Sequence, residues 1–168
     1  MKRILMIGTG GTIASGKTAE GLMPELTSEQ LLSFVPAVSS LCRAECLQLL
    51  SLDSTNLAPT HWLLIAKAIR ERYDQYDGFV ISHGTDTMAY TASAVTFLLP
   101  DIDVPVVFTG SQLPLADVLS DGPDNLRTAF AMAASGKPGV FLAFDRKVML
   151  GCRSVKLRAT GFNAFESV

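Results

Sequence analysis

The sequence predicts a doubly wound α/β fold, in which a mainly parallel sheet carries helices on both faces. Short apolar runs alternate with helical patterns from end to end, and these runs are not polar at every second residue. Strands that are apolar on both sides belong in a parallel sheet covered by helices. The length of 168 residues suits one domain of this kind. The five apolar runs are residues 3–7, 46–52, 78–82, 104–109 and 140–144.

Four helices are expected between these runs. Thr27 and Gln30 have the spacing of a capping box, which predicts a short helix after Thr27. Pro59 suits the first position of a second helix. The apolar stripe of that helix recurs at helical spacing and comprises Trp62, Ile65, Ala66, Ile69 and Tyr73.

A third helix is expected to begin at Asp86 or Thr87 and to end at Leu98, and a fourth to cover residues 124–134. Right-handed crossovers between parallel strands bring the carboxyl ends of all strands to one edge of the sheet, where ligands of such sheets bind. The segments at this edge are residues 9–12, 53–56, 83–87 and 110–112.

The segment from Gly11 to Thr18 matches the phosphate-loop pattern G-x-x-x-x-G-K-[ST]. A working phosphate loop opens a helix, whose N-terminal N–H groups hold the phosphates. Gly21 and Pro24 follow almost at once and disfavour a helix there. We therefore expect residues 15–23 to form a mobile polar loop that covers a site, and a nucleotide-binding function remains a minor alternative.

Composition favours a globular protein without nucleic-acid or membrane partners. The net charge is only −2, and Lys and Arg form no cluster that would neutralise phosphates. No run of 18 apolar residues is present. Cys42, Cys46 and Cys152 are odd in number and have no zinc-ligand spacing, so we expect neither a disulfide framework nor a metal site.

Hydroxyl side chains are unusually dense at the predicted edge. Some of them could be helix caps, Thr85 or Thr87 for example. A threonine nucleophile needs a base, and neither His61 nor His83 is well placed for that role. A lysine held by an aspartate could serve instead, and Lys156 and Asp86 are available.

These residues stand in motifs that resemble the bacterial-type L-asparaginases, nearest the cytoplasmic type I group. The resemblance extends over the whole chain in order. The T-G-G-T-I motif at residues 9–13 and the H-G-T-D-T motif at 83–87 are its most specific parts. The others are residues 53–54, 107–112, 120–121 with 125–126, and 148–165.

The resemblance implies hydrolysis of L-asparagine to L-aspartate and ammonia without a cofactor or a metal. Thr12 matches the nucleophile of the family, and Thr85, Asp86 and Lys156 match a hydrogen-bonded triad. Ser54 and Asp86 would hold the α-carboxylate and the α-ammonium of the substrate. Asp53 and the backbone of Ser111 would line the same pocket. Which threonine performs which step is left open.

The resemblance also implies that residues 1–168 form the N-terminal catalytic domain of a cytoplasmic homo-oligomer, a dimer or tetramer, whose smaller C-terminal domain is absent from this chain. One departure is Leu22, where type I relatives usually have a tyrosine that helps to polarise the first threonine. A sensor that binds asparagine or aspartate with little turnover is the main alternative. Preference for asparagine over glutamine is not predicted.

Overall fold

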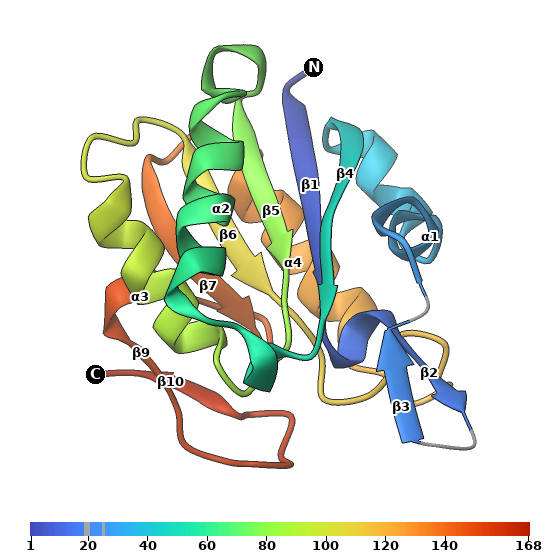
Figure 1. Cartoon of the computed structure of the whole chain (residues 1–168). Coiled ribbons are helices and arrows are strands. Elements are labelled where there is room, and N and C mark those ends of the chain that lie inside the picture. Colours follow the sequence, from blue (N-terminus) through green and yellow to red (C-terminus); the bar gives the residue numbers. More distant parts are fainter. Residues whose placement is uncertain (19–20, 25) are drawn as a thin grey trace.

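A six-stranded sheet forms the centre of the structure, a computed structural model (Figure 1). The description covers residues 1–18, 21–24 and 26–168, without the side chains of residues 17–25. All neighbouring strands of the sheet are parallel except β7 and β8. In spatial order the strands are β4 (Arg43–Leu52), β1 (Arg3–Gly10), β5 (Gly78–Ser82), β6 (Pro105–Thr109), β7 (Gly139–Phe144) and β8 (Lys147–Leu150).

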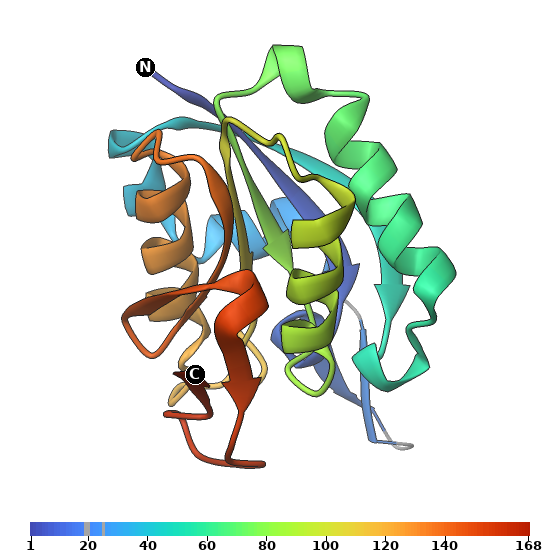
Figure 2. The ribbon, with the colours of Figure 1, turned by 90° about the vertical axis from the view of Figure 1, so that its left-hand side faces the viewer.

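Helices cover both faces of this sheet, as the doubly wound prediction requires (Figure 2). One face packs against α2 (Pro59–Arg70) and α3 (Met88–Leu98), with Ile65, Ile69 and Val95 fully buried. The other face packs against α1 (Ser28–Ser33) and α4 (Gly122–Ala133), with Leu31 and Phe130 buried. The predicted fold class is confirmed.

The expected starts of α1 and α2 are confirmed. Thr27 accepts from the Gln30 N–H at 3.4 Å, and the Gln30 side chain accepts from the Thr27 N–H at 2.8 Å. The predicted apolar stripe of α2 extended too far, because Tyr73 lies beyond the helix in the turn Tyr73–Gln75. There its hydroxyl binds Asp103 instead of packing against the sheet.

The α3 helix begins at Met88, later than expected, and neither candidate threonine caps it. Thr87 occupies the N-cap position without a side-chain capping bond. Its hydroxyl donates to the Ser54 oxygen at 2.8 Å and so ties two loops together. The α4 helix begins at Gly122, two residues before its expected start, with Pro123 in its first turn.

The edge strand β8 was not among the five predicted strands, although the sequence allows a hairpin corner at Asp145 and Arg146. It pairs antiparallel to β7 through a tight turn at Asp145 and Arg146, whose φ angles are 52° and 58°. Two such left-handed residues match the twist of a hairpin, although glycine or asparagine usually fills these positions. Because this turn contains no glycine, its chemistry does not mark the hairpin in the sequence.

The segment around the phosphate-loop pattern forms a hairpin. Strands β2 (Ser15–Thr18) and β3 (Gly21–Pro24) pair antiparallel, with Ser15 opposite Pro24 and Thr18 opposite Gly21. The Lys-Thr pair therefore lies in a strand, and the helix N-terminus that a phosphate loop needs is not formed there. The side chain of Leu22, the departure from the family pattern, lies outside the described residues.

The last part of the chain crosses the carboxyl edge of the sheet. Strands β9 (Ser154–Lys156) and β10 (Phe165–Ser167) form a small antiparallel pair there, and Phe165 packs edge-on against Phe144 with 4.9 Å between ring centroids. This arrangement brings the predicted Lys156 to the edge where β5 ends. Within the described residues, no helix is long and apolar enough to cross a membrane.

Candidate active site

The predicted site residues lie at the point where the strand order reverses. From β1 the chain continues to β4 on one side, and then returns to β5 on the other side of β1. Ligands of doubly wound sheets bind at such a point, outside the carboxyl ends of the strands. Here the T-G-G-T turn begins in the last two residues of β1, the Asp53-Ser54 pair follows β4, and the H-G-T-D turn follows β5.

The T-G-G-T turn is fixed by hydrogen bonds to the ends of β4 and β5. Gly11 donates its N–H to the Leu52 oxygen at 3.0 Å and has a φ of 83°, a conformation that glycine adopts without strain. Thr9 donates its hydroxyl to the Ser82 oxygen at 2.7 Å. Thr12 then begins the short 3-10 helix Thr12–Ala14. Its partly buried side chain is thereby placed at the carboxyl edge.

Two glycines allow the turns to touch. A Cβ added to Gly11 would lie 2.3 Å from the Gly84 nitrogen, and one added to Gly84 would lie 2.6 Å from Ser54 Cβ and Oγ. The three loops thus approach one another closely because Gly11 and Gly84 have no side chain. Thr12 and Thr85 each follow one of these glycines, so the fold brings the two signature threonines into adjoining turns.

Thr85, Asp86 and Lys156 form a connected polar group. Lys156 Nζ donates to Thr85 Oγ1 at 2.8 Å and to Asp86 Oδ1 at 2.7 Å. The Lys156 side chain is 14% exposed and the Asp86 side chain 59%. The ammonium is therefore largely enclosed by protein, whereas the carboxylate also faces solvent and can receive a cationic group.

Gln112 makes contacts with Thr85 and Asp121 that were not predicted from the sequence. Thr85 donates its hydroxyl to Gln112 Oε1 at 3.1 Å. The Gln112 N–H is bound by the Asp121 carboxylate at 3.0 Å, and Asn125 donates to both Asp121 and the Gly110 oxygen. Gln112 lies in the segment 107–112 and Asp121 and Asn125 in the segments 120–121 and 125–126, all of which belong to the resemblance. Nothing in these segments predicted that their side chains would bind one another.

His83 supports the H-G-T-D turn from beneath. Its Nδ1 lies 2.7 Å from the Gly84 oxygen and its Nε2 2.9 Å from Thr91 Oγ1. A carbonyl oxygen can only accept, so Nδ1 carries the proton and Nε2 accepts from Thr91. Complete burial lowers the pKa of His83 from 6.5 to about 4. The ring is thus a neutral structural group rather than a catalytic base.

Asp53 and Ser111 are at the edge, but their side chains are used locally. Asp53 Oδ1 accepts from the Thr55 N–H and from the Thr55 hydroxyl, both at 2.8 Å. Ser111 is buried and donates its hydroxyl to the Leu113 oxygen. The structure does not join either side chain to the Lys156 group. For Ser111 only the backbone was expected to line the pocket, and that expectation stays a prediction.

The carboxyl edge offers nucleophilic hydroxyls, an enclosed ammonium and an accessible carboxylate, which suit acyl transfer from a small zwitterion. Among the described residues, no group of three His, Cys, Asp or Glu side chains is arranged to hold a metal ion.

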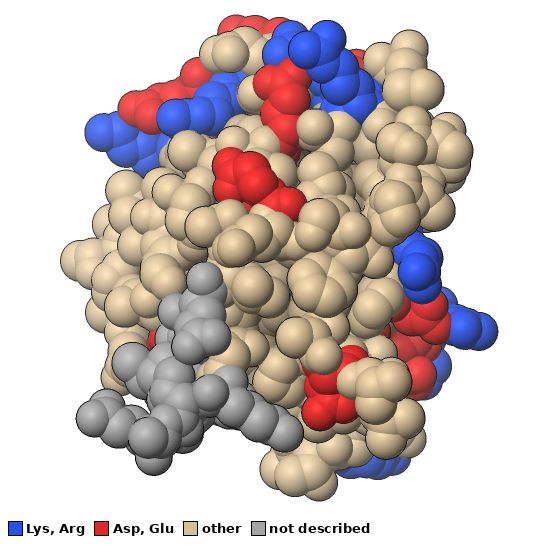
Figure 3. Space-filling view, turned by 90° about the vertical axis from the view of Figure 1, so that its right-hand side faces the viewer, with Lys and Arg blue, Asp and Glu red and all other residues tan. Residues whose placement is uncertain are grey.

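On the face seen in Figure 3, Lys and Arg lie beside Asp and Glu at the ends, and few charges lie over the middle.

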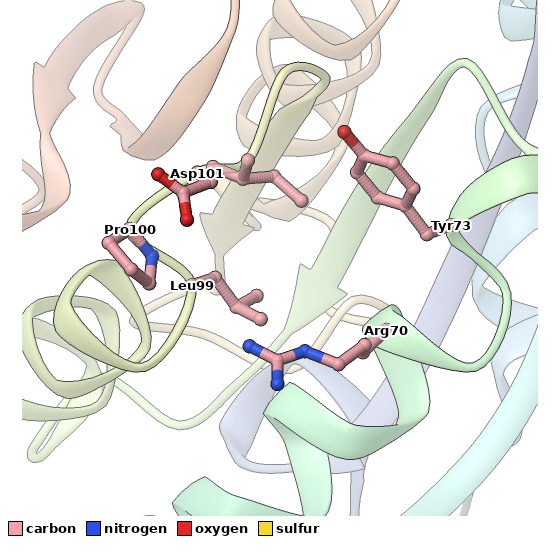
Figure 4. Close-up of a pocket in the computed structure, with 6 residues that line it drawn as sticks. Arg70, Tyr73, Leu99, Pro100 and Asp101 are labelled. Atoms are coloured by element: carbon pink, nitrogen blue, oxygen red, sulfur yellow. The ribbon is translucent and has the colours of Figure 1, made fainter.

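A cavity of about 230 Å³ lies at the opposite end of the sheet, between the ends of α2 and α3 (Figure 4). Two of its three polar side chains, those of Arg70 and Tyr73, have partners within the chain, which leaves the Asp101 carboxylate. Arg70 donates to the Leu98 oxygen at 3.1 Å, and the Tyr73 hydroxyl binds Asp103. This cavity therefore lacks the convergent free polar groups of a ligand site.

Comparison with known sequences agrees with the geometry at the carboxyl edge. The family model "Asparaginase, N-terminal" matches residues 3–168. The chain is 45% identical over 167 residues to an L-asparaginase of Thermococcus kodakarensis, aligning 99% of this chain with 51% of that protein. It is 41% identical over 173 residues to L-asparaginase 1 of Escherichia coli, again with 99% and 51% aligned.

Solved structures give the same result. The thermostable L-asparaginase from Thermococcus kodakarensis superposes with a TM-score of 0.92, covering 99% of this chain and 51% of that one. A probable cytoplasmic L-asparaginase from Campylobacter jejuni superposes with a TM-score of 0.91 at 33% identity, covering 99% and 52%. The chain thus spans about half the length of the curated relatives it matches.

Proposed function

This chain belongs to the asparaginase family, and we propose that the protein containing it hydrolyses L-asparagine to L-aspartate and ammonia. The observation that carries the proposal is the pair of hydrogen bonds from Lys156 to Thr85 and Asp86. These groups lie 71 and 70 residues apart in sequence and meet at the carboxyl edge. A pocket that only binds its ligand needs the carboxylate, but it does not need a lysine on the adjacent hydroxyl.

In the proposed first step, Thr12 Oγ1 attacks the side-chain amide carbon of asparagine. The C–N bond breaks, ammonia leaves with the proton of the hydroxyl, and an ester to Thr12 remains. In the second step water adds to the ester carbon, the C–O bond breaks, and a proton returns to Thr12. Atoms balance as asparagine plus water giving aspartate plus ammonia.

We assign Thr85, Lys156 and Asp86 to proton transfer. The contact of Lys156 with Thr85 gives a path along which a proton can pass between the hydroxyl and the amine as water is activated. The ion pair with Asp86 holds the lysine side chain in that position. A relay of this kind contributes roughly 10²- to 10⁴-fold to a rate.

Substrate binding is assigned to groups around the same turn. The exposed carboxylate of Asp86 would bind the α-ammonium, since opposite charges pair well at hydrogen-bond distance. The buried Ser54, which contacts Gly84, would donate to the α-carboxylate, and Asp53 and the Ser111 backbone would complete the pocket. We also propose a cytoplasmic homo-oligomer, as the sequence resemblance implies; one matching structure is a probable cytoplasmic L-asparaginase.

The central test measures ammonia release and substrate binding together in the full-length protein. Thr12→Ala should lower turnover by roughly 10⁴-fold or more, because it removes the reacting hydroxyl. Thr85→Ala should lower turnover by roughly 10²- to 10⁴-fold, because it breaks the relay. Lys156→Met keeps the apolar stem and loses the amine, so we expect a loss of roughly 10²- to 10⁴-fold. Thermal unfolding should stay near that of the wild type in all three.

Two outcomes would contradict the proposal. Tight asparagine binding by the wild type without ammonia release would indicate the sensor instead. Faster release from glutamine than from asparagine would correct the substrate. Rapid quenching followed by peptide mass mapping identifies the acylated residue, and an aspartyl group on Thr85 rather than Thr12 would exchange the two assigned steps.

A further inference from the structure

The side-chain amide of Gln112 joins the catalytic turn to the loop that follows Lys156. Its Oε1 accepts from Thr85 Oγ1 at 3.1 Å. Its Nε2 donates to the Ala159 oxygen at 3.1 Å and to the Gly161 oxygen at 3.0 Å. Gln112 follows β6, Thr85 follows β5, and Ala159 and Gly161 follow β9. This one side chain therefore connects the loops after three strands.

These contacts fix which way the amide faces. The oxygens of Ala159 and Gly161 can only accept, so they select the NH₂ end of the amide. The oxygen end must then face Thr85, and the Thr85 hydroxyl must donate to it. Lys156 can only donate while it is an ammonium, so Thr85 accepts from Lys156 and donates to Gln112. Both hydrogen-bond directions of this hydroxyl are thereby determined.

The main chain of Gln112 is held as firmly as its side chain. The Asp121 carboxylate accepts from the N–H groups of Gln112 and Leu113 at 3.0 and 3.2 Å. Asn125 donates to Asp121 at 3.0 Å and accepts from the Asp145 N–H at 2.9 Å, which connects the support to the β7–β8 turn. Gln112 is therefore a fixed reference point for Thr85 and not a mobile surface side chain.

We infer that Gln112 is a positioning residue: it sets the rotamer of Thr85 so that the hydroxyl oxygen stays aligned with Lys156. The inference rests on the proposed function and extends it to a residue that need not touch substrate. Removing the amide leaves the Thr85 hydroxyl without its acceptor. The side chain can then rotate, and the distance between Thr85 Oγ1 and Lys156 Nζ is no longer maintained.

The test uses Gln112→Met in the full-length protein, because methionine keeps the length of the side chain and removes both hydrogen-bonding ends. We expect kcat to fall roughly 10- to 100-fold, as a small misplacement of a reacting group costs about that much. KM should change by less than about twofold, since the substrate contacts are made by other residues.

Arg158→Met is the matched control for loosening the loop after Lys156. Arg158 donates to the Asn163 oxygen at 3.0 Å and to Glu166 at 2.8 Å, so its loss frees the same loop without touching Thr85. The variant should keep kcat within about twofold of the wild type. An equal loss of kcat in Arg158→Met and Gln112→Met would reduce Gln112 to a structural tie and overturn the inference.

A second readout separates positioning from structure. Thr85→Ser lacks the γ-methyl group that restrains χ1, so its hydroxyl depends more on Gln112. The factor by which Gln112→Met lowers kcat should therefore be at least roughly threefold larger in the Thr85→Ser background than in the wild type. If the two residues acted independently, this factor would be the same in both backgrounds. Simple multiplication of the two losses would contradict a positioning role.

Crystal structures of the wild type and Gln112→Met test the inference without any turnover. We expect a displaced or mixed Thr85 rotamer in the variant, and an unchanged rotamer with an unchanged Lys156 distance would overturn it. If the wild type releases no ammonia, the proposed function fails by itself, and these structures still decide the role of Gln112.

Discussion

His83 is a fully buried titratable side chain directly beneath the H-G-T-D turn. Its neutral ring is held by the Gly84 oxygen and by Thr91, and its edge packs on Phe108 with 6.0 Å between centroids. Burial lowers its pKa to about 4, from 6.5 in an exposed chain. Between these values the unfolded chain binds a proton that the folded chain excludes, so the fold loses stability as the pH falls.

We predict that the free energy of unfolding decreases by up to about 3 kcal/mol between pH 6.5 and pH 4 through His83 alone. The contribution is fully present above pH 6.5 and is lost as the pH approaches 4. Urea unfolding at several pH values should show a shallower decrease in His83→Gln. Should that variant not fold, NMR titration of the wild-type ring gives the pKa directly, and a value near 6.5 contradicts the prediction.

At the scale of single residues, the sequence indicated the groups that meet but not the bonds that hold them. Thr85, Asp86 and Lys156 were expected from specific motifs, and the structure joins them at 2.7 and 2.8 Å. The contact of Gln112 with Thr85 spans 27 residues and depends on the tertiary fold. A single sequence carries no signal for such a pairing, because glutamine at a strand end is common and uninformative.

At the scale of elements, apolar runs predicted the buried strands and capping residues predicted the starts of helices. The buried strands β5, β6 and β7 were expected nearly to their ends, since every residue in them is apolar or small. The edge strand β8 was missed because only one of its four residues is buried. The β2–β3 hairpin was taken for a loop because its glycines and proline, at Gly16, Gly21 and Pro24, favour irregular structure.

The β7–β8 turn gives an element-scale prediction. Arg146 has a φ of 58°, which costs a residue with a Cβ about 1–2 kcal/mol, whereas glycine adopts it freely. Replacing Arg146 by either glycine or alanine removes the same ion pair with Asp124. The glycine variant should therefore be the more stable of the two by roughly 0.5–1 kcal/mol, measured by urea unfolding.

Lys147 supplies the matched control for this comparison, because it is the next residue and lies in the extended strand β8. There the order should reverse, with Lys147→Ala more stable than Lys147→Gly, since glycine loses more conformational entropy in a strand. Equal stability of Arg146→Gly and Arg146→Ala would show that the turn relaxes, and the predicted backbone strain would be wrong.

At the scale of the whole molecule, the core is built on both faces of the sheet from residues of this chain. One cluster joins α2 and α3 to the sheet and includes Phe108 and Phe165, and the other joins α1 and α4 and includes Phe130. Fold class followed from the sequence because parallel strands need cover on both sides. The position of Lys156 did not follow from the strand pattern, because β9 crosses the edge of the sheet after a hairpin whose second strand, β8, was not predicted.

The last prediction concerns residues 1–168 expressed alone. We expect them to unfold cooperatively in urea, because both core clusters are complete within the described residues and the central sheet pairs all six strands. A non-cooperative transition, or near-ultraviolet circular dichroism without tertiary signal, would contradict this part. The folded residues 1–168 can then be assayed for turnover independently of their stability.

Turnover per site should nevertheless be much lower than in a protein that also carries the second half found in the relatives. The Asp86 side chain is 59% exposed, and Leu157 and Phe162, which follow Lys156, are about half exposed. Water at this edge weakens each charge contact to a substrate and removes the preorganisation on which rate depends. Assayed at equal concentration, equal turnover in both proteins would mean that residues 1–168 supply every group of the active site.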